Sequence, residues 1–137
     1  IMQFVSRLRA IAAGIGAMGG EHALFQSAGE IIKAEAQSAM GTYRYGWPRL
    51  KDETIARKAT GDSPLVESGK MRGSIRVRTS MGEVEVYSTD PNFRWHELGT
   101  SKMPARPVFA IAAQRKGYDA AMVFHRRVGV ILRGALN

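Results

Sequence analysis

The sequence predicts a single α+β domain, in which an antiparallel β-sheet built on a central hairpin packs against N-terminal and C-terminal helices. Three observations lead to this prediction. Apolar residues recur at helical spacing in residues 4–40 and again in residues 118–136. Between them, residues 71–88 alternate between apolar and polar side chains, as a half-buried hairpin does. The length of 137 residues fits one domain, residues 1–137, with its own core.

Two helices are expected over about residues 4–40. The first has apolar side chains at helical spacing from Phe4 to Ile15 and ends at Gly19 and Gly20. The second runs from about His22 to Met40, and Gly41 follows it as a left-handed cap. The apolar face of the second helix comprises Phe25, Ala28, Ile32, Ala36 and Ala39.

An aromatic loop over residues 43–50 follows these helices. It holds Tyr43, Tyr45 and Trp47, which we interpret as anchors of an irregular segment rather than as a stacking platform for bases. Residues 51–59 are expected to form a short helix, and residues 60–64 a turn. The side chains expected to face inward near this helix are Leu50, Thr54 and Ile55.

The hairpin is the clearest strand signal in the chain. Residues 71–80 and 83–88 alternate in polarity, and Met81 and Gly82 between them suit a two-residue turn. A slip of one residue would turn the valines toward solvent, so the apolar pattern specifies the register. The cross-strand pairs expected from it are Val77 with Val86 on the apolar side and Arg78 with Glu85 on the polar side.

A stiff loop, the proline arm (Thr100–Pro107), follows an aromatic run that ends at Gly99. Pro104 and Pro107 restrict the backbone of the arm, so it is held away from the body at low entropic cost. The residues expected to be presented outward, toward a neighbouring protein, are Lys102, Met103 and Arg106.

The chain after the arm becomes apolar again. Residues 108–113 fit either a strand or the first turns of a helix, and residues 118–136 predict a helix. Gly117, Gly129 and Gly134 weaken the helical prediction because glycine lowers helix propensity.

Charge is distributed unevenly along the chain. The net charge of +8 divides into +3 for residues 1–60, −1 for residues 61–100 and +6 for residues 101–137. A solvated basic face explains this pattern, and so does contact with an acidic partner or with passing nucleic acid. No helix-turn-helix, zinc-finger or RNA-recognition signature accompanies it, which argues against sequence-specific reading of DNA. The residues that would face a DNA channel or a partner are Arg115, Lys116, Arg126, Arg127 and Arg133.

The composition also limits the compartment. There is no cysteine, which excludes disulfides and thiolate chemistry and fits a reducing environment. No apolar run approaches the ~20 residues that cross a bilayer, so no membrane contact is expected. The arginines and small residues near the N-terminus superficially resemble a secretory signal, but we interpret them as mature sequence.

No catalytic, metal-binding or cofactor-binding constellation emerges. His96 and Glu97 resemble the start of a zinc-protease helix, but Thr100 stands where the second histidine would be required. The other histidines, His22 and His125, are distant in sequence. Ser68 lacks the context of a nucleophile elbow, and the N-terminal glycines do not follow a strand as a phosphate-binding loop would. The sequence therefore does not indicate an enzyme or a cofactor.

Two sequence motifs resemble those of a known protein family, and the predicted hairpin begins within the first of them. The first has the pattern Leu-x-x-(Thr/Ser)-Gly-x-(Leu/Met)-x-x-Ser-(Ile/Leu), and the second joins a Glu-x-Gly-Thr run to Pro-Ala-Arg-Pro. The first is matched by Leu65, Ser68, Gly69, Met71, Ser74 and Ile75. The second is matched by Glu97, Gly99, Thr100, Pro104, Ala105, Arg106 and Pro107. Together with Trp47, this order resembles the tailed-bacteriophage virion morphogenesis family of head–tail joining, neck and tail-completion proteins. The sequence departs from the family pattern at two places. Ser68 stands where threonine is common, and Val108 separates Pro107 from Phe109, where phenylalanine commonly follows the proline directly.

The resemblance, which covers about residues 22–115, implies a structural role without a cofactor. Family members are similar to ring-forming components that join head and tail and let DNA pass. It implies a homo-oligomeric ring, made in the host bacterial cytoplasm and located in the virion, with neighbouring head-connector and tail proteins as partners and transient, non-specific contact with phage DNA. The interface residues it implies are Thr100, Ser101, Lys102, Met103, Pro104, Arg106 and Pro107.

Glu97 is expected to stabilise the root of the proline arm through an ion pair or a backbone cap, as an alternative to a solvent-facing carboxylate. Gly69 is expected to turn the chain into the hairpin, and Gly99 to release the arm. The alternative function is a small basic nucleic-acid-binding protein that acts through phosphate contacts, whose affinity would fall steeply with salt.

Overall fold

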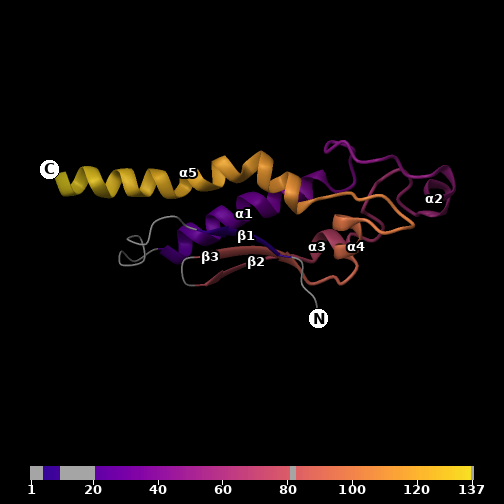
Figure 1. Cartoon of the computed structure of the whole chain (residues 1–137), viewed down its shortest axis with the longest axis horizontal. Helices are drawn as coiled ribbons and strands as arrows, with labels where there is room; N and C mark the ends of the chain where they lie inside the picture. The colour runs from indigo at the N-terminus through magenta and orange to yellow at the C-terminus, as the bar shows by residue number, and fades with distance from the viewer. Residues whose placement is uncertain (1–4, 10–20, 81–82, 137) are drawn as a thin grey trace.

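The computed structural model describes residues 5–9, 21–80 and 83–136, which form three layers. A sheet makes the first layer, helix α1 (Glu21–Ala39) the second and helix α5 (Phe109–Leu136) the third (Figure 1). Because α1 packs against both the sheet and α5, it forms the centre of the molecule. The predicted α+β class, with an antiparallel sheet covered by N-terminal and C-terminal helices, is confirmed.

The sheet has three strands in the order β1-β3-β2, all antiparallel. They are β1 (Val5–Arg9), β2 (Ile75–Ser80) and β3 (Glu83–Ser88). The register predicted for the hairpin is confirmed, with Val77 opposite Val86 and Arg78 opposite Glu85. Arg78 and Glu85 form an ion pair across the strands. The turn predicted at residues 81–82 lies outside the described residues.

The prediction of a first helix from Phe4 is wrong for residues 5–9, which form β1. This segment, Val-Ser-Arg-Leu-Arg, also alternates between apolar and polar residues, so its short length fits either period. Pairing with β3 decides between them, because a strand there satisfies the backbone groups along one side of the central strand. The rest of the predicted helix, residues 10–20, lies outside the described residues.

The start of the predicted hairpin is also wrong. Residues 70–73 form a single helical turn, α3 (Lys70–Gly73), so the first strand begins at Ile75 rather than at Met71. Gly69 precedes this turn in the left-handed region, with φ of 81°. The turn ends where the Ser74 hydroxyl donates to the carbonyl oxygen of Met71 at 2.5 Å. The predicted sharp turn at Gly69 is thus present, but it leads into a helical turn.

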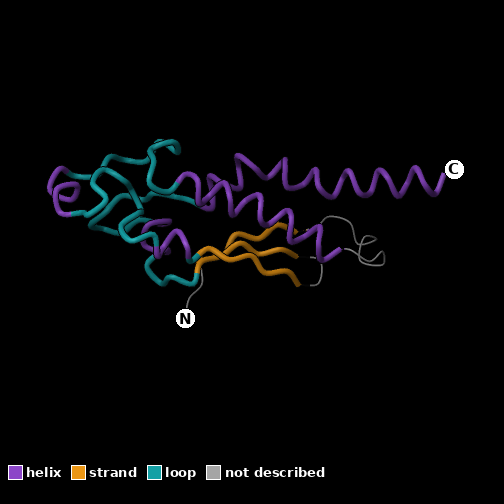
Figure 2. The backbone as a smooth tube through the Cα atoms, turned by 180° about the vertical axis from the view of Figure 1, so that it is seen from behind, coloured by secondary structure: helices purple, strands orange, loops and turns teal. Residues whose placement is uncertain are grey.

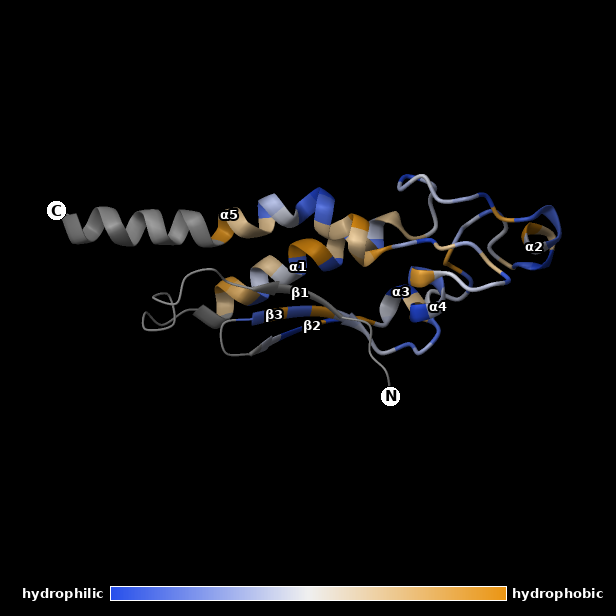
Figure 3. Ribbon diagram, viewed as in Figure 1, coloured by the Kyte–Doolittle hydropathy of each residue, from blue (hydrophilic) through white to orange (hydrophobic). Residues whose placement is uncertain are grey.

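Helix α1 closely matches its predicted range. All five residues of its predicted apolar face are buried, and Gly41 has the predicted left-handed conformation with φ of 89°. Figure 3 shows apolar residues along α1 and in the first turns of α5. Gly29 brings α1 close to the sheet, since a Cβ atom there would lie 2.8 Å from a methyl group of Val84 and would also overlap Val77.

The shorter helices differ in part from prediction. Helix α2 (Asp52–Arg57) buries none of its residues fully. Thr54 and Ile55, both expected to face inward, are its two half-buried residues, and Leu50 before it is also half-buried. The aromatic run forms helix α4 (Phe93–Leu98) and ends at Gly99 as expected. Helix α5 begins at Phe109, well before the predicted start at residue 118, so residues 108–113 mainly belong to a helix. Within the described ranges, no helix is both long and apolar enough to cross a membrane.

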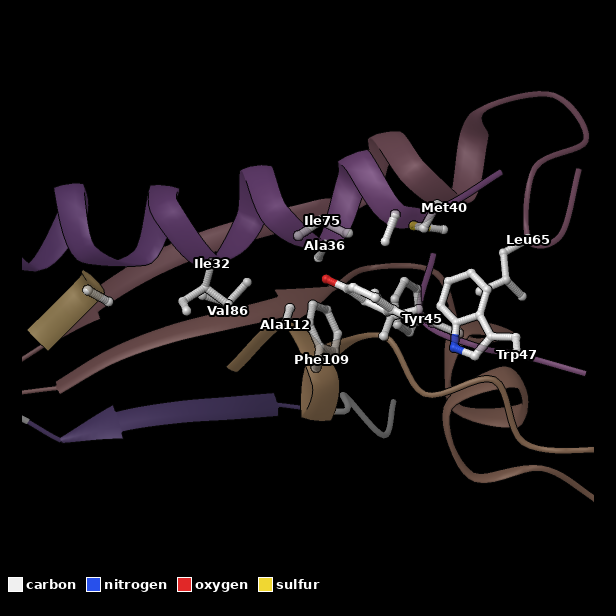
Figure 4. Packing of buried hydrophobic residues seen from close by; sticks show 14 of the residues in the cluster. Ile32, Ala36, Met40, Tyr45, Trp47, Leu65, Ile75, Val86, Phe109 and Ala112 are labelled. Atoms are coloured by element: carbon white, nitrogen blue, oxygen red, sulfur yellow. The ribbon is translucent and has the colours of Figure 1, made fainter. Parts of the chain in front are cut away.

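The loops gather at one end of the layered body, and α5 extends beyond the sheet at the other (Figures 1 and 2). At the loop end, Tyr45 and Trp47 are buried, and Trp47 packs near Leu65 (Figure 4). The rings of Tyr45 and Trp47 meet edge to face at 5.4 Å, and those of Phe93 and Phe109 stack at 4.7 Å. The aromatic loop is therefore an anchored segment, as predicted.

Candidate partner-binding site: the proline arm and its root

The proline arm begins at a position that only glycine fits. Gly99 has φ of 75° and ψ of 169°, a conformation essentially restricted to glycine. A Cβ atom there would lie 2.8 Å from the backbone nitrogen of Ala105. The two ends of the arm thus approach each other closely, which makes the arm a compact loop.

The tip of the arm is held by Thr100. Its backbone N–H donates to the carbonyl oxygen of Met103 at 3.0 Å. Its hydroxyl oxygen accepts from the backbone nitrogens of Lys102 at 3.1 Å and Met103 at 3.2 Å. Thr100, Ser101, Lys102 and Pro104 are exposed and Met103 is half-buried. This part of the arm is therefore available to a neighbour, as expected.

The expectation that Arg106 points outward is wrong. Arg106 is 7% exposed, and its guanidinium donates from Nε at 3.0 Å and from Nη2 at 2.9 Å to the carbonyl oxygen of Pro48. A third bond of 3.3 Å reaches the carbonyl oxygen of Arg49. A guanidinium satisfies buried carbonyls well because it holds several donors in one plane. Arg106 therefore fastens the arm to the aromatic loop.

Two further hydrogen bonds attach the end of the arm to the body. The backbone N–H of Arg106 donates to the carbonyl oxygen of His96 at 2.7 Å. The indole N–H of Trp47 donates to the carbonyl oxygen of Pro107 at 2.8 Å. The arm thus has an exposed half at residues 100–104 and an anchored half at residues 105–107.

Glu97 caps helix α5 from inside the protein. One carboxylate oxygen accepts from the backbone nitrogens of Phe109 at 2.8 Å and Ala110 at 3.2 Å, and the other accepts from Val108. Burial raises the pKa of Glu97, and the three backbone hydrogen bonds oppose that rise. Carboxylates stabilise helix N-termini, where backbone N–H groups lack partners. The backbone-cap role predicted for Glu97 is confirmed.

Other motif residues serve the packing of the loop end. Leu65 is buried and has φ of 65°, an uncommon conformation for a leucine. Ser74 is buried and shares a hydrogen bond of 2.6 Å with Ser88, which joins the end of α3 to the end of β3. Neither residue lies on the exposed half of the arm, so both have structural roles here.

The basic residues predicted to face DNA or a partner divide into two groups. Arg115 lies over the ring of Tyr45 at 4.8 Å and donates to the carbonyl oxygen of Arg44 at 3.2 Å. Lys116 pairs with Asp119 at 3.3 Å. Arg126, Arg127 and Arg133 lie on the C-terminal half of α5, and their side chains are outside the described part of the chain.

A buried network that the sequence did not predict joins α1 to the aromatic loop. The Tyr45 hydroxyl donates to Glu35 at 2.5 Å, and Arg44 pairs with the same carboxylate at 2.7 Å. Burial favours a higher pKa for Glu35, but these two hydrogen bonds outweigh it and lower the pKa. Burial and the bond to Glu35 raise the pKa of Tyr45. The network orients Tyr45 beneath Arg115.

Sequence reasoning also missed two exposed apolar side chains beside the arm. Trp95 is 48% exposed and Leu98 is 58% exposed, and they lie three residues apart on α4. Their spacing places them on one face of the helix, directly before the arm. Phe93, on the same helix, is buried, so position in the sequence alone did not separate the two faces.

No family model, curated protein or solved structure matches this chain. In residues 5–9, 21–80 and 83–136, no group of three or more His, Asp or Glu side chains is placed to hold a metal ion.

Proposed function

We propose that this protein is a structural component of a bacteriophage neck or tail end, which assembles into a homo-oligomeric ring that joins head and tail and lets DNA pass. In this proposal the exposed half of the proline arm contacts the next subunit or an adjoining connector or tail protein. The protein would be made in the host bacterial cytoplasm and located in the virion. It makes or breaks no covalent bond.

One observation carries the proposal: two large apolar side chains, Trp95 and Leu98, are exposed beside a firmly anchored loop. Tryptophan is among the residues most enriched at the energetic centres of protein interfaces. The arm's anchored half reduces the entropy that binding would cost the exposed half. Cyclic contacts between identical subunits would bury these side chains in every copy and leave no growing end.

The proposal is tested by the mass of the purified full chain in solution and by electron microscopy of the assemblies. We expect rings or ring-sized oligomers whose population rises with concentration. The double variant Trp95→Ser with Leu98→Ser should remain folded and lose assembly, while Glu30→Ser, an exposed change on α1, should not. A chain that stays monomeric at every concentration, and that fails to join purified connector or tail proteins, would contradict the proposal.

A gel-shift titration separates this proposal from the alternative of a basic nucleic-acid-binding protein. Binding through several phosphates loses affinity by orders of magnitude between dilute and physiological salt. A ring component should bind free duplex DNA weakly at both salt concentrations. Tight, salt-sensitive binding by a monomer would favour the alternative.

A further inference from the structure

A basic cleft opens at the loop end, between the proline arm, α2, α3 and α4. Its volume is about 670 Å³, within the range of ligand-binding pockets. Seven Lys or Arg side chains and two carboxylates, Glu67 and Asp90, line it among the described residues. This cleft is distinct from the exposed apolar side chains Trp95 and Leu98, neither of which lines it.

Part of the positive charge in the cleft has no partner. Arg49 pairs with Asp62, Lys58 donates to a backbone carbonyl and Arg106 is anchored as described above. By contrast, the side chains of four cations make no hydrogen bond or ion pair within the described chain. They are Lys51, Arg57, Lys70 and Lys102. Glu67 and Asp90 offset only part of this charge, so the cleft keeps an excess of positive charge, which favours an anionic ligand.

Two of the basic groups in the cleft, Lys58 and His96, have a lowered pKa. Burial lowers the pKa of Lys58, and the nearby guanidinium of Arg106 lowers it further against the opposing effect of Glu67. Burial and Arg106 likewise lower the pKa of His96. Burial is the larger cause for both groups, and an anion bound beside them would favour their charged forms.

His96 provides an independent observation. It lines the cleft, and its Nδ1 atom is buried without a hydrogen-bond partner in the described structure. A buried polar atom without a partner costs free energy, and in native proteins such atoms are few and often have a functional explanation. The imidazole is therefore a polar group in the wall of the cleft with one hydrogen-bonding position unused in the described structure.

The floor of the cleft distinguishes between kinds of anion. Leu50, Leu65, Met71 and Met103 line it, and its described lining contains no Phe, Tyr or Trp. Single-stranded nucleic acids bind through several bases stacked on aromatic rings, and the imidazole of His96 is the one ring that the described lining offers. Methionine and leucine instead accommodate aliphatic side chains, and methionine-rich surfaces adapt to peptides. Leu65 stands there in its unusual positive-φ conformation, and such conformations concentrate at ligand sites.

We propose that this cleft binds an acidic, amphipathic peptide segment of another protein, with its carboxylates on the free lysines and arginine and its aliphatic side chains on the floor. This inference goes beyond the ring proposed above and holds whether or not the chain forms rings. The exposed half of the arm forms one wall of the cleft through Lys102 and Met103. Binding would therefore connect the arm to the incoming segment.

The test measures fluorescence anisotropy of a short labelled peptide in which glutamates alternate with leucines, titrated with the full chain. We expect saturable binding, and weakening by about tenfold or more when Lys70→Glu or Lys102→Glu reverses a charge in the cleft. Arg72→Glu is the matched control, because Arg72 is exposed on the same helical turn as Lys70 and does not line the cleft. It should change the affinity much less. Circular dichroism and thermal melting would establish that all three variants are folded.

Two further ligands, measured in the same way, distinguish an amphipathic acidic peptide from a purely polar acidic peptide and from a nucleic acid. A peptide with serines in place of the leucines should bind more weakly, and so should a labelled oligothymidylate. The proposal is overturned if Arg72→Glu weakens binding as much as Lys70→Glu, since overall charge would then explain it. It is also overturned if the serine peptide or the oligonucleotide binds as tightly, or if no saturable binding occurs.

Discussion

Where α1 crosses the sheet, apolar side chains at regular spacing pack against the valines of β2 and β3, and Gly29 allows the close approach. At the loop end, individual polar side chains instead bind single backbone groups. Glu97 caps α5, Arg106 reaches Pro48 and Trp47 reaches Pro107. The layered body is therefore stabilised by many small apolar contacts. The loop end is stabilised by a few hydrogen bonds, each of which depends on one particular side chain.

This difference predicts how the two regions respond to mutation. Regular apolar packing loses stability in proportion to the volume changed and adjusts in part. A buried donor or acceptor that loses its partner bears the full cost of desolvation. Conservative changes at the loop end should therefore cost more than similar changes in the layered body. The substitutions below test that expectation, from the largest effect to the smallest.

Glu97→Ala should have the largest effect. It removes the acceptor of three backbone N–H groups at the start of α5, two of them in buried residues. We expect a loss of about 3 to 4 kcal/mol in the free energy of unfolding, from unsatisfied donors and the lost helix cap. Urea denaturation followed by circular dichroism measures it. Glu67→Ala, an exposed carboxylate nearby in the fold, is the control and should cost little. Equal losses in the two variants would show that the cap is not important.

Gly99→Ala should follow, with a loss of about 2 to 3 kcal/mol, because it combines an unfavourable backbone conformation with a collision. Gly46→Ala is the matched control. Gly46 has a similar φ of 73°, but a Cβ atom there meets nothing within 4 Å. The difference between the two losses reports the contact with Ala105 together with the strain of the ψ of 169° at Gly99. If both variants lose the same stability, the close approach of the arm's ends contributes nothing.

The two regions also differ in how well the sequence predicted them. The apolar face of α1 and the pairs Val77–Val86 and Arg78–Glu85 followed from periodicity, which reflects burial directly. Strand β1 did not follow from periodicity, because a segment of five residues fits both the helical and the strand period, and because its partner β3 lies far along the chain. Long-range pairing overrides local pattern in such cases.

The loop end was predicted where a residue type alone indicates its role, as with the anchoring aromatic residues, Gly99 and Glu97. Glu97 stands directly before the arm, so an ion pair or a backbone cap could be expected from a carboxylate there; that the cap is at the start of a helix could not, because α5 was expected only from residue 118. The burial of Arg106 could not, because its acceptors are the carbonyl oxygens of Pro48 and Arg49, and backbone groups carry no signature in the sequence. The exposure of Trp95 and the cleft formed by distant cations likewise depend on the tertiary arrangement.

Gly29→Ala tests the layered body. The added methyl group would overlap side-chain methyl groups of Val77 and Val84. Because valine side chains are stiff and Val84 is fully buried, they can shift only in part, and we expect a loss of about 1 to 3 kcal/mol. Combining it with Val77→Ala, which removes the nearest methyl groups, should recover part of the loss in a double-mutant cycle of unfolding free energies. Strict additivity of the two changes would contradict the close approach of α1 to the sheet.

Gly117→Ala should have the smallest effect and the opposite sign. Gly117 lies within α5, its backbone needs no positive φ, and a Cβ atom there would meet nothing within 4 Å. The change should raise the free energy of unfolding by about 0.5 to 1 kcal/mol through higher helix propensity. The same substitution, glycine to alanine, thus destabilises at Gly29 and stabilises at Gly117, and thermal melting of both variants measures the difference. A loss of stability at Gly117 would contradict this expectation, because neither a collision nor a positive φ opposes the added methyl group there.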